Sequence, residues 1–98
     1  MTNKVNLAIQ ILPLQMNKED TYGCIDAAIA KVAASGMKYV VCPFETVIEG
    51  EYNAVMQLAN EMQEACYNNG AKELLVNMKL HRNVEKDMAI EDKVGKYK

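Results

Sequence analysis

The first segment of the chain, Lys4 to Leu12, alternates between apolar side chains and small or polar ones. The apolar positions are Val5, Leu7, Ile9 and Ile11, and the positions between them are Asn6, Ala8 and Gln10. A period of two is typical of a β-strand with one buried face, because successive side chains of a strand point to opposite sides. We therefore expect a strand covered on one face only. Pro13 should end it, because proline has no N–H for a strand ladder.

Two longer segments repeat their apolar residues at the spacing of an α-helix. Asn17 can cap the first, whose opening turn carries Glu19 and Asp20 near the positive helix end. Gly36 suits the left-handed position beyond its end. The second helix is predicted from Glu51 to about Asn69, where an Asn-Gly pair stops it. The apolar stripes are Ile25, Ala28, Ile29, Val32 and Ala33 in the first helix, and Val55, Leu58, Ala59, Met62, Ala65 and Cys66 in the second.

Three further strands and a short terminal helix complete the pattern. The β-rich runs Lys38–Cys42 and Thr46–Glu49 surround a tight connection, which predicts a hairpin. The segment Glu73–His81 alternates again. One of its faces carries Leu74, Val76, Met78 and Leu80, and the other carries Leu75, Asn77, Lys79 and His81. Beyond Arg82 the chain is charged, but Ile90, Val94 and Tyr97 recur at helical spacing and predict one or two turns of helix lying on the body.

The order of elements is therefore strand, helix, strand, strand, helix, strand, which predicts an α+β fold of the ferredoxin-like βαββαβ type. In this fold a four-stranded antiparallel sheet carries two helices on one face, because the crossovers are right-handed. A short C-terminal helix is added to it. A chain of 98 residues is long enough for one such domain, so we interpret residues 1–98 as a single domain.

Composition and missing motifs exclude several functions. The net charge of −2 argues against nucleic acid as a partner, and no apolar run is long enough for a membrane span. The three cysteines are scattered and form no CxxC pair, so we expect reduced thiols, no metal centre and a cytoplasmic location. His81 is the only histidine and no nucleophile–base pair is visible, so we expect no enzyme.

The second face of the predicted sheet is the informative one. The first and last strands should be neighbours in this topology, so Gln10 and Asn77 would share that face. Leu12 and Leu75 lie on the same face, and exposing these apolar side chains to water would be unfavourable. A half-apolar sheet face usually meets another protomer, so we expect sheet-to-sheet dimers with a small ligand held near the seam. Gln10 and Asn77 are candidate ligand contacts or, alternatively, hydrogen-bonding residues of the protomer interface.

The run from Pro43 to Glu51 combines an aromatic ring, a hydroxyl and three carboxylates around a hairpin and a helix start. It fits an ordinary turn and strand followed by an acidic residue at the start of a helix. It also fits a site for a small cationic or amine-bearing ligand. In the second interpretation Glu45 or Glu49 would supply charge. Thr46 would supply a hydrogen bond, and Phe44 a flat wall.

Three stretches of the chain resemble one known family. They are SGMKY at Ser35–Tyr39, PFETVIEGEY at Pro43–Tyr52 and IEDKVGKY at Ile90–Tyr97. They resemble the thiamine-binding protein family, the YkoF-like group also labelled UPF0045 or DUF77, and the resemblance covers nearly the whole chain. It implies a ferredoxin-like fold, dimers or tetramers built by packing sheets, and binding of thiamine or its hydroxymethylpyrimidine part. The residues it carries over are Thr46 and Glu49 as contacts, with Pro43, Phe44 and Glu45 in the rim.

The expected function is that of a non-catalytic binding protein for salvage, transport or buffering, with thiamine as ligand and no cofactor. Thiamine joins an aminopyrimidine, which needs donors and acceptors, to a thiazolium cation, which needs a carboxylate or an aromatic face. No diphosphate cradle is visible, so unphosphorylated thiamine is favoured over the coenzyme form. The alternative is an oligomeric ligand-sensing or assembly module whose sheet face serves only as an interface.

Overall fold

The computed structural model describes residues 3–97 and confirms the predicted order of elements. Its strands are β1 (Lys4–Pro13), β2 (Lys38–Val41), β3 (Thr46–Glu51) and β4 (Leu74–His81). Its helices are α1 (Lys18–Ala34), α2 (Tyr52–Asn68) and the short α3 (Ile90–Val94), which a 3₁₀ turn over Gly95–Tyr97 follows. Over the described residues, none of these helices combines the length and the apolar character needed to cross a bilayer.

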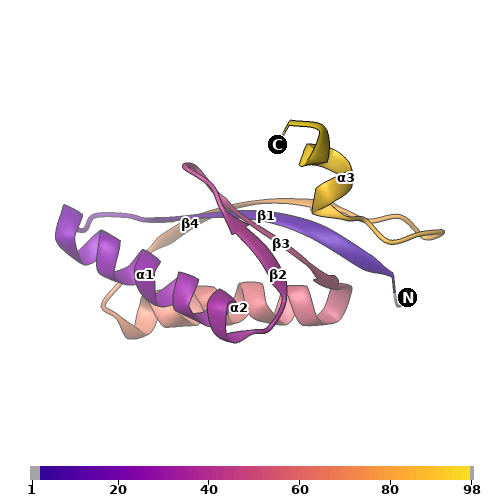
Figure 1. Cartoon of the computed structure of the whole chain (residues 1–98). Helices are drawn as coiled ribbons and strands as arrows, with labels where there is room; N and C mark the ends of the chain where they lie inside the picture. Colours follow the sequence, from indigo (N-terminus) through magenta and orange to yellow (C-terminus); the bar gives the residue numbers. More distant parts are fainter. Residues whose placement is uncertain (1–2, 98) are drawn as a thin grey trace.

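The four strands form one antiparallel sheet in the order β2-β3-β1-β4. The first and last strands are therefore neighbours, as predicted. Helices α1 and α2 lie together on one face of the sheet, and α3 lies on the opposite face (Figure 1). This arrangement is the ferredoxin-like α+β fold. It leaves most of one sheet face without a covering layer.

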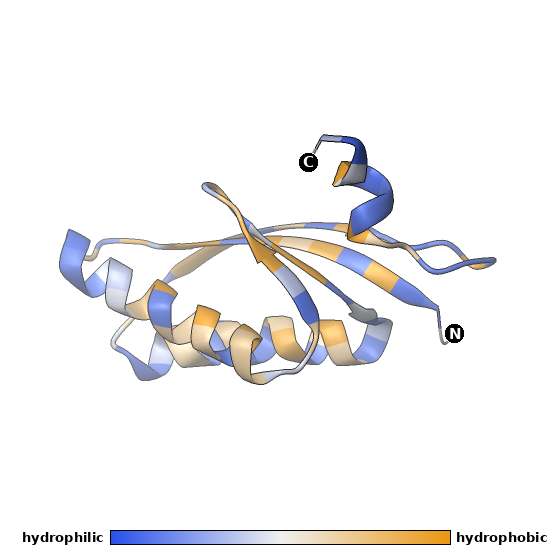
Figure 2. Cartoon of the chain, viewed as in Figure 1, coloured by the Kyte–Doolittle hydropathy of each residue, from blue (hydrophilic) through white to orange (hydrophobic). Residues whose placement is uncertain are grey.

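The alternating pattern of β1 places its apolar residues in the core. Val5, Leu7, Ile9 and Ile11 are all buried between the sheet and the helices. The alternation is visible along β1 as successive hydrophobic and hydrophilic bands (Figure 2). The predicted stripe of α2 is also buried at every position. Burying apolar surface in this way is the main favourable contribution to folding.

The buried stripe of α1 differs from the predicted one. The residues that are buried are Cys24, Ala28 and Val32, whereas Ile25 is half-buried and Ala33 is exposed. The reason is that α1 packs mainly against α2 and touches the sheet only slightly. A helix that packs against a neighbouring helix buries a different set of residues from a helix that packs against a sheet.

The ends of the helices follow the predicted capping residues. The side chain of Asn17 accepts the backbone N–H of Asp20 at 2.8 Å, which caps α1. Gly36 has a φ of 79° just beyond α1, a conformation that glycine adopts without a steric penalty. Glu51 ends β3 and caps α2 as well, because its Oε2 accepts the N–H of Ala54 at 3.1 Å. The strand therefore continues directly into the helix.

Several strand boundaries differ by one or two residues from the expected ones. β2 ends at Val41 and not at Cys42, β3 continues to Glu51 and not only to Glu49, and β4 begins at Leu74 and not at Glu73. Pro13 is the last residue of β1 and not the first residue beyond it, and it lies opposite Leu74 of β4. Proline is tolerated at this place because a strand end needs fewer backbone donors than a strand interior.

Candidate ligand site on the open face of the sheet

The sheet face opposite α1 and α2 is built from rows of side chains that the strand register places side by side. One row consists of His81 in β4, Asn6 in β1, Glu49 in β3 and Lys38 in β2. The next row consists of Lys79, Ala8, Val47 and Val40, in the same order of strands. A polar row therefore borders a row that is apolar except at its β4 end.

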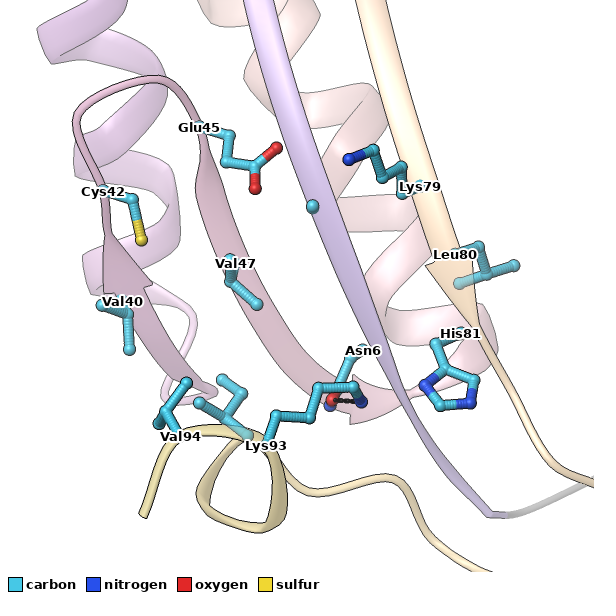
Figure 3. A pocket seen from close by; sticks show the side chains of 12 residues that line it. Asn6, Val40, Cys42, Glu45, Val47, Lys79, Leu80, His81, Lys93 and Val94 are labelled. Carbon is cyan, nitrogen blue, oxygen red and sulfur yellow. Dashed lines mark hydrogen bonds between the residues drawn. The ribbon is translucent and has the colours of Figure 1, made fainter. Parts of the chain in front are cut away.

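A hollow of about 500 Å³ lies on this face, between the sheet and the C-terminal segment (Figure 3). Ala8 explains its position, because a methyl group in a central strand leaves space between Val47 and Lys79 on the flanking strands. The apolar lining includes Val40, Val47, Ile90 and Val94. The polar and charged lining includes Asn6, Cys42, Glu45, Lys79, His81 and Lys93. A hollow of this size with an apolar middle and a few polar groups suits a small organic molecule.

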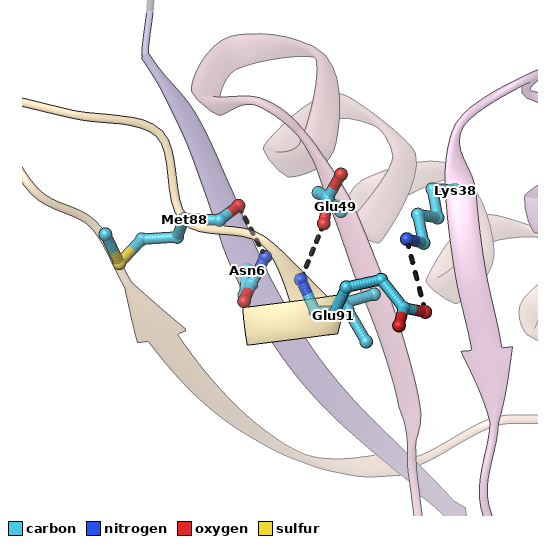
Figure 4. A network of polar contacts seen from close by, with 6 residues as sticks. Asn6, Lys38, Glu49, Met88 and Glu91 are labelled. Carbon is cyan, nitrogen blue, oxygen red and sulfur yellow. Dashed lines mark hydrogen bonds and ion pairs between the residues drawn. The ribbon is translucent and has the colours of Figure 1, made fainter. Parts of the chain in front are cut away.

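The C-terminal segment forms one wall of the hollow because hydrogen bonds hold it against β1 and β3. The N–H of Met88 donates to the carbonyl of Lys4 at 2.9 Å, and Nδ2 of Asn6 donates to the carbonyl of Met88 at 3.0 Å. The N–H of Ile90 donates to Oε1 of Glu49 at 2.7 Å (Figure 4). Glu49 thereby satisfies an N–H at the start of α3, a group that has no partner within the helix.

Charged side chains lie at both ends of the hollow. Nζ of Lys93 donates to Oδ1 of Asn6, whose side chain is only 5% exposed. Lys38 pairs with Glu91 at 3.6 Å outside the hollow. Glu45 supplies the carboxylate that lines the hollow, and Figure 3 shows it at the end away from Lys93. Lys79 lies at the Glu45 end in the same view, and Glu49 lies under α3 in the row of Asn6, so each end of the hollow has both an acidic and a basic group nearby.

The structure divides the residues predicted as ligand contacts between the two faces of the sheet. Glu45 lines the hollow, and Glu49 lies beside it under α3. Gln10 and Asn77 lie opposite each other on the same face, with Nδ2 of Asn77 3.2 Å from Oε1 of Gln10. Their hydrogen bond links β1 to β4 within the protomer.

The other three predicted residues lie around a second groove, on the helix side of the hairpin. Thr46 is buried at 6% exposure, and it lines this groove of about 390 Å³ together with Pro43 and Phe44. Glu45 and Gln10 line the edge of this groove as well. Phe44 is 80% exposed at the hairpin tip. Because side chains alternate along a strand, Thr46 and Glu49 point to opposite faces of β3. The open-face hollow therefore does not bring these two residues together.

Several residues of the hollow were not among the predicted contacts. Asn6, Ala8 and Lys79 could have been found from the alternation of β1 and β4, because that pattern already assigned them to the open face. Lys93 carried no such signal, since its place depends on how the C-terminal segment folds back. Cys42 lines the hollow from the start of the hairpin turn, and it was interpreted as part of a strand.

The remaining cysteines lie in the core. Cys24 and Cys66 face each other across the packing of α1 and α2, where Sγ of Cys66 is 3.4 Å from the carbonyl oxygen of Cys24. Burial, together with the neighbouring Cys24, raises the pKa of the Cys66 thiol to about 11. A thiol of this kind is unreactive, because the thiolate is the reactive form. Over residues 3–97, no group of three potential metal-binding side chains lies together.

The fold and the hollow define the class of this protein as a small ferredoxin-like domain with a ligand-sized site on its open sheet face. The family model described as thiamine-binding protein matches residues 7–98. The chain therefore belongs to the thiamine-binding protein family.

Individual relatives agree with this assignment. A UPF0045 protein of Clostridium perfringens is 29% identical over 93 residues, which are 95% of this chain and 96% of that protein. A domain of unknown function of the DUF77 group from Bacillus cereus is 33% identical, with a TM-score of 0.92 over 100% of this chain and 93% of that chain. A Thermotoga maritima protein assigned provisionally to thiamine biosynthesis or salvage is 30% identical, with a TM-score of 0.86 over 97% of this chain and 99% of that chain. The family and this last relative support a thiamine-related role.

Proposed function

We propose that this protein binds thiamine or its hydroxymethylpyrimidine moiety, without catalysis, in the hollow on the open face of the sheet. The observation that carries the proposal is the hollow of about 500 Å³ in a chain that belongs to the thiamine-binding family. Such a protein would serve salvage, transport or buffering of the vitamin. The buried, reduced thiols of Cys24 and Cys66 favour the cytoplasm as its location.

The chemistry of the hollow suits the two rings of thiamine. The apolar row of Ala8, Val47 and Val40 offers a flat surface for an aminopyrimidine. Glu45 supplies a carboxylate for the thiazolium cation at one end. Oε2 of Glu49 takes part in no hydrogen bond with the described residues, so it is available to a pyrimidine amine. Ligand binding therefore uses one acid for charge and a second for hydrogen bonding.

The ligand contacts proposed from the sequence fall into two groups, according to the face of the sheet on which they lie. Glu45 lines the open-face hollow, and Glu49, Gln10 and Asn77 lie on the same face of the sheet. Thr46, Pro43 and Phe44 would contact a ligand only in the second groove. Glu45 lines both places, whereas Thr46 lines the second groove alone, so calorimetric titration of Thr46→Ala with thiamine distinguishes them. We expect Glu45→Gln to weaken binding by about 1–3 kcal/mol and Thr46→Ala to leave it nearly unchanged.

The same titration on the unmodified protein tests the function itself. We expect binding heat with thiamine or with hydroxymethylpyrimidine. If neither compound gives binding heat at millimolar concentration, the proposal is wrong. If Thr46→Ala abolished binding while Glu45→Gln did not, the site would lie in the groove on the helix side.

We also propose that two copies pack their open faces together as homodimers, which can pair into tetramers. Leu12 and Leu75 lie opposite each other on this face and are 37% and 51% exposed. A partner covering them would close the hollow from above. The alternative function, an assembly or sensing module whose sheet face is only an interface, predicts normal oligomers that bind no thiamine.

A further inference from the structure

Strand β4 is the longer of the two edge strands of the sheet. In the order β2-β3-β1-β4 it has a neighbour on one side only, and it has 8 residues, against 4 in β2. Every residue of β4 from Asn77 to His81 is exposed. A long edge strand without proline is a template for pairing with another strand, because its outer row of backbone groups is free.

The strand register shows which backbone groups of β4 point outward. The N–H of Leu14 donates to the carbonyl of Glu73 at 3.0 Å, one step beyond the Pro13–Leu74 pair, so the backbone of Glu73 faces β1. Backbone groups of successive residues in a strand point to opposite edges, so the odd-numbered residues of β4 bond to β1. The even-numbered residues direct their N–H and C=O groups away from the sheet, and no strand of the described residues pairs with them. They are Leu74, Val76, Met78 and Leu80.

The side chains of these even-numbered residues lie on the helix side of the sheet. Leu74 and Val76 are partly buried and pack against the core. Met78 and Leu80 are 45% and 38% exposed, because the two helices do not reach this end of the edge strand. The outer edge of β4 therefore combines free backbone donors and acceptors with apolar side chains that lack a cover.

A second copy of β4, antiparallel to the first and centred on Asn77, matches the helix side of this edge. In that register Leu74 of one copy lies opposite Leu80 of the other, and Val76 lies opposite Met78. Each pair joins a side chain that packs on the core to one that is exposed. Cross-strand apolar pairs of this kind stabilise a sheet, so the cores of the two copies would become continuous.

The same register also matches polar groups on the open face. Glu73 of one copy lies opposite His81 of the other, and an imidazole N–H can donate to a carboxylate. Registers shifted by one residue are less favourable. Centred on Met78, the pairing would set Leu74 opposite Arg82, whose guanidinium group lies over the Tyr52 ring at 3.8 Å.

We infer that two copies of this chain pair along β4 in the register centred on Asn77, which joins two four-stranded sheets into one continuous sheet. This contact uses the edge of the sheet, whereas the dimer proposed above uses its open face. Because the two contacts lie on different surfaces, both can form in one assembly. The edge contact is then the one through which open-face dimers pair into tetramers.

Light scattering coupled to size-exclusion chromatography of the full chain tests the edge contact. Met78→Lys places a charge in the contact on the helix side, away from the open face, so the mass should fall twofold, from tetramer to dimer. Met78→Pro should have the same effect, because it removes an outward N–H and no hydrogen bond to β1. Tyr39→Lys is the matched control. Tyr39 is 38% exposed on the helix side of the other edge strand, opposite the buried Ile48, so this variant should keep the unmodified mass.

An engineered disulfide tests the register. Asn77 lies opposite Asn77 of the second copy, in a pair whose Cα atoms are about 4.5 Å apart, a distance that a disulfide can span. In a Cys42→Ser background, Asn77→Cys treated with oxidised glutathione should therefore give a covalent dimer on a denaturing gel. Lys79→Cys, on the same face of β4, should stay monomeric, because its counterpart lies several residues away. Adding Met78→Lys to Asn77→Cys should suppress the disulfide.

Two results would overturn the inference. One is a mass that neither Met78→Lys nor Met78→Pro changes, and the other is an Asn77→Cys disulfide that persists with Met78→Lys, which would come from packing of the open faces. A mass that falls with Tyr39→Lys alone would place the contact along β2 instead. These measurements use no ligand, so they are independent of thiamine binding. A protein that binds no thiamine, but whose mass halves with Met78→Lys, would overturn the proposed function alone.

Discussion

At the scale of single residues, the open face owes its properties to a small side chain and a buried amide. Ala8 leaves the space for the hollow, and Asn6 ties the C-terminal segment to β1 through Met88 and Lys93. A buried amide is favourable only while its hydrogen bonds are made. Asn6 should therefore matter more for stability than its polar neighbours on the same strand.

Asn6→Ala should lower the free energy of unfolding by about 1–3 kcal/mol, because the Met88 carbonyl loses a buried donor. Urea denaturation measures this change. Gln10→Ala is the matched control, since its hydrogen bond to Asn77 is exposed and its loss should cost about 0.5 kcal/mol or less. Equal effects of the two substitutions would show that the segment is not held through Asn6.

The thiol of Cys66 predicts a dependence of stability on pH. Its pKa is raised to about 11 by burial and by Cys24, whereas an exposed thiol has a pKa of about 8.5. The folded state binds this proton more tightly, so the contribution to stability is complete below about pH 8.5 and is lost as pH rises toward 11. Urea midpoints between pH 8 and 11 should fall for the unmodified protein and fall less steeply for Cys66→Ala. Identical slopes would contradict the prediction.

At the scale of elements, the alternation in β1 and β4 and the stripe of α2 made the sheet and its core predictable. In β1 and α2 the local period matches the final environment, whereas in the edge strand β4 Met78 and Leu80 of the apolar face stay exposed. The stripe of α1 was less predictable, because α1 packs on α2 and its buried face depends on that helix. The site was predictable only in part for a similar reason. Glu45 and the face of β1 could be assigned from local pattern, whereas Lys93 depends on a contact between distant ends of the chain.

Glu49 anchors α3 to the sheet, a role that its sequence context did not indicate. Glu49→Ala removes the acceptor for the Ile90 N–H, so α3 should loosen from the sheet. We expect the amide of Ile90 to exchange with solvent faster, and stability to fall by about 0.5–2 kcal/mol, as for the loss of a helix cap. Glu64→Ala on the exposed side of α2 provides the control. Unchanged exchange at Ile90 would mean that the rest of the segment suffices to hold α3.

At the scale of the whole molecule, two helices cover one face of the sheet and a short terminal segment covers only part of the other. The uncovered part includes Leu12, Leu75 and the hollow. A half-apolar face next to a ligand-sized hollow lets assembly and binding share one surface. Oligomerisation and ligand affinity should therefore be linked in this protein.

Leu75→Lys should convert the dimer to a monomer, because it replaces an exposed apolar residue of the proposed interface with a charge. Light scattering coupled to size-exclusion chromatography measures the mass. Val84→Lys is the matched control, since Val84 is 78% exposed in the loop after β4, away from the sheet. A monomeric mass for the unmodified protein, or a dimer that Leu75→Lys does not affect, would rule out the sheet-face interface.

The hollow on the open face is the proposed thiamine site, and the thiol of Cys42 lies in its wall. Cys42 lines the hollow and also the second groove, and it is partly exposed, whereas Cys24 and Cys66 are buried. A thiol-specific reagent at neutral pH should therefore modify one thiol quickly, and Cys42→Ser should abolish that fast reaction. The measurement is the rate of this reaction with and without saturating thiamine. We predict that thiamine slows it at least tenfold; an unchanged rate, with thiamine bound by calorimetry, would place the ligand elsewhere.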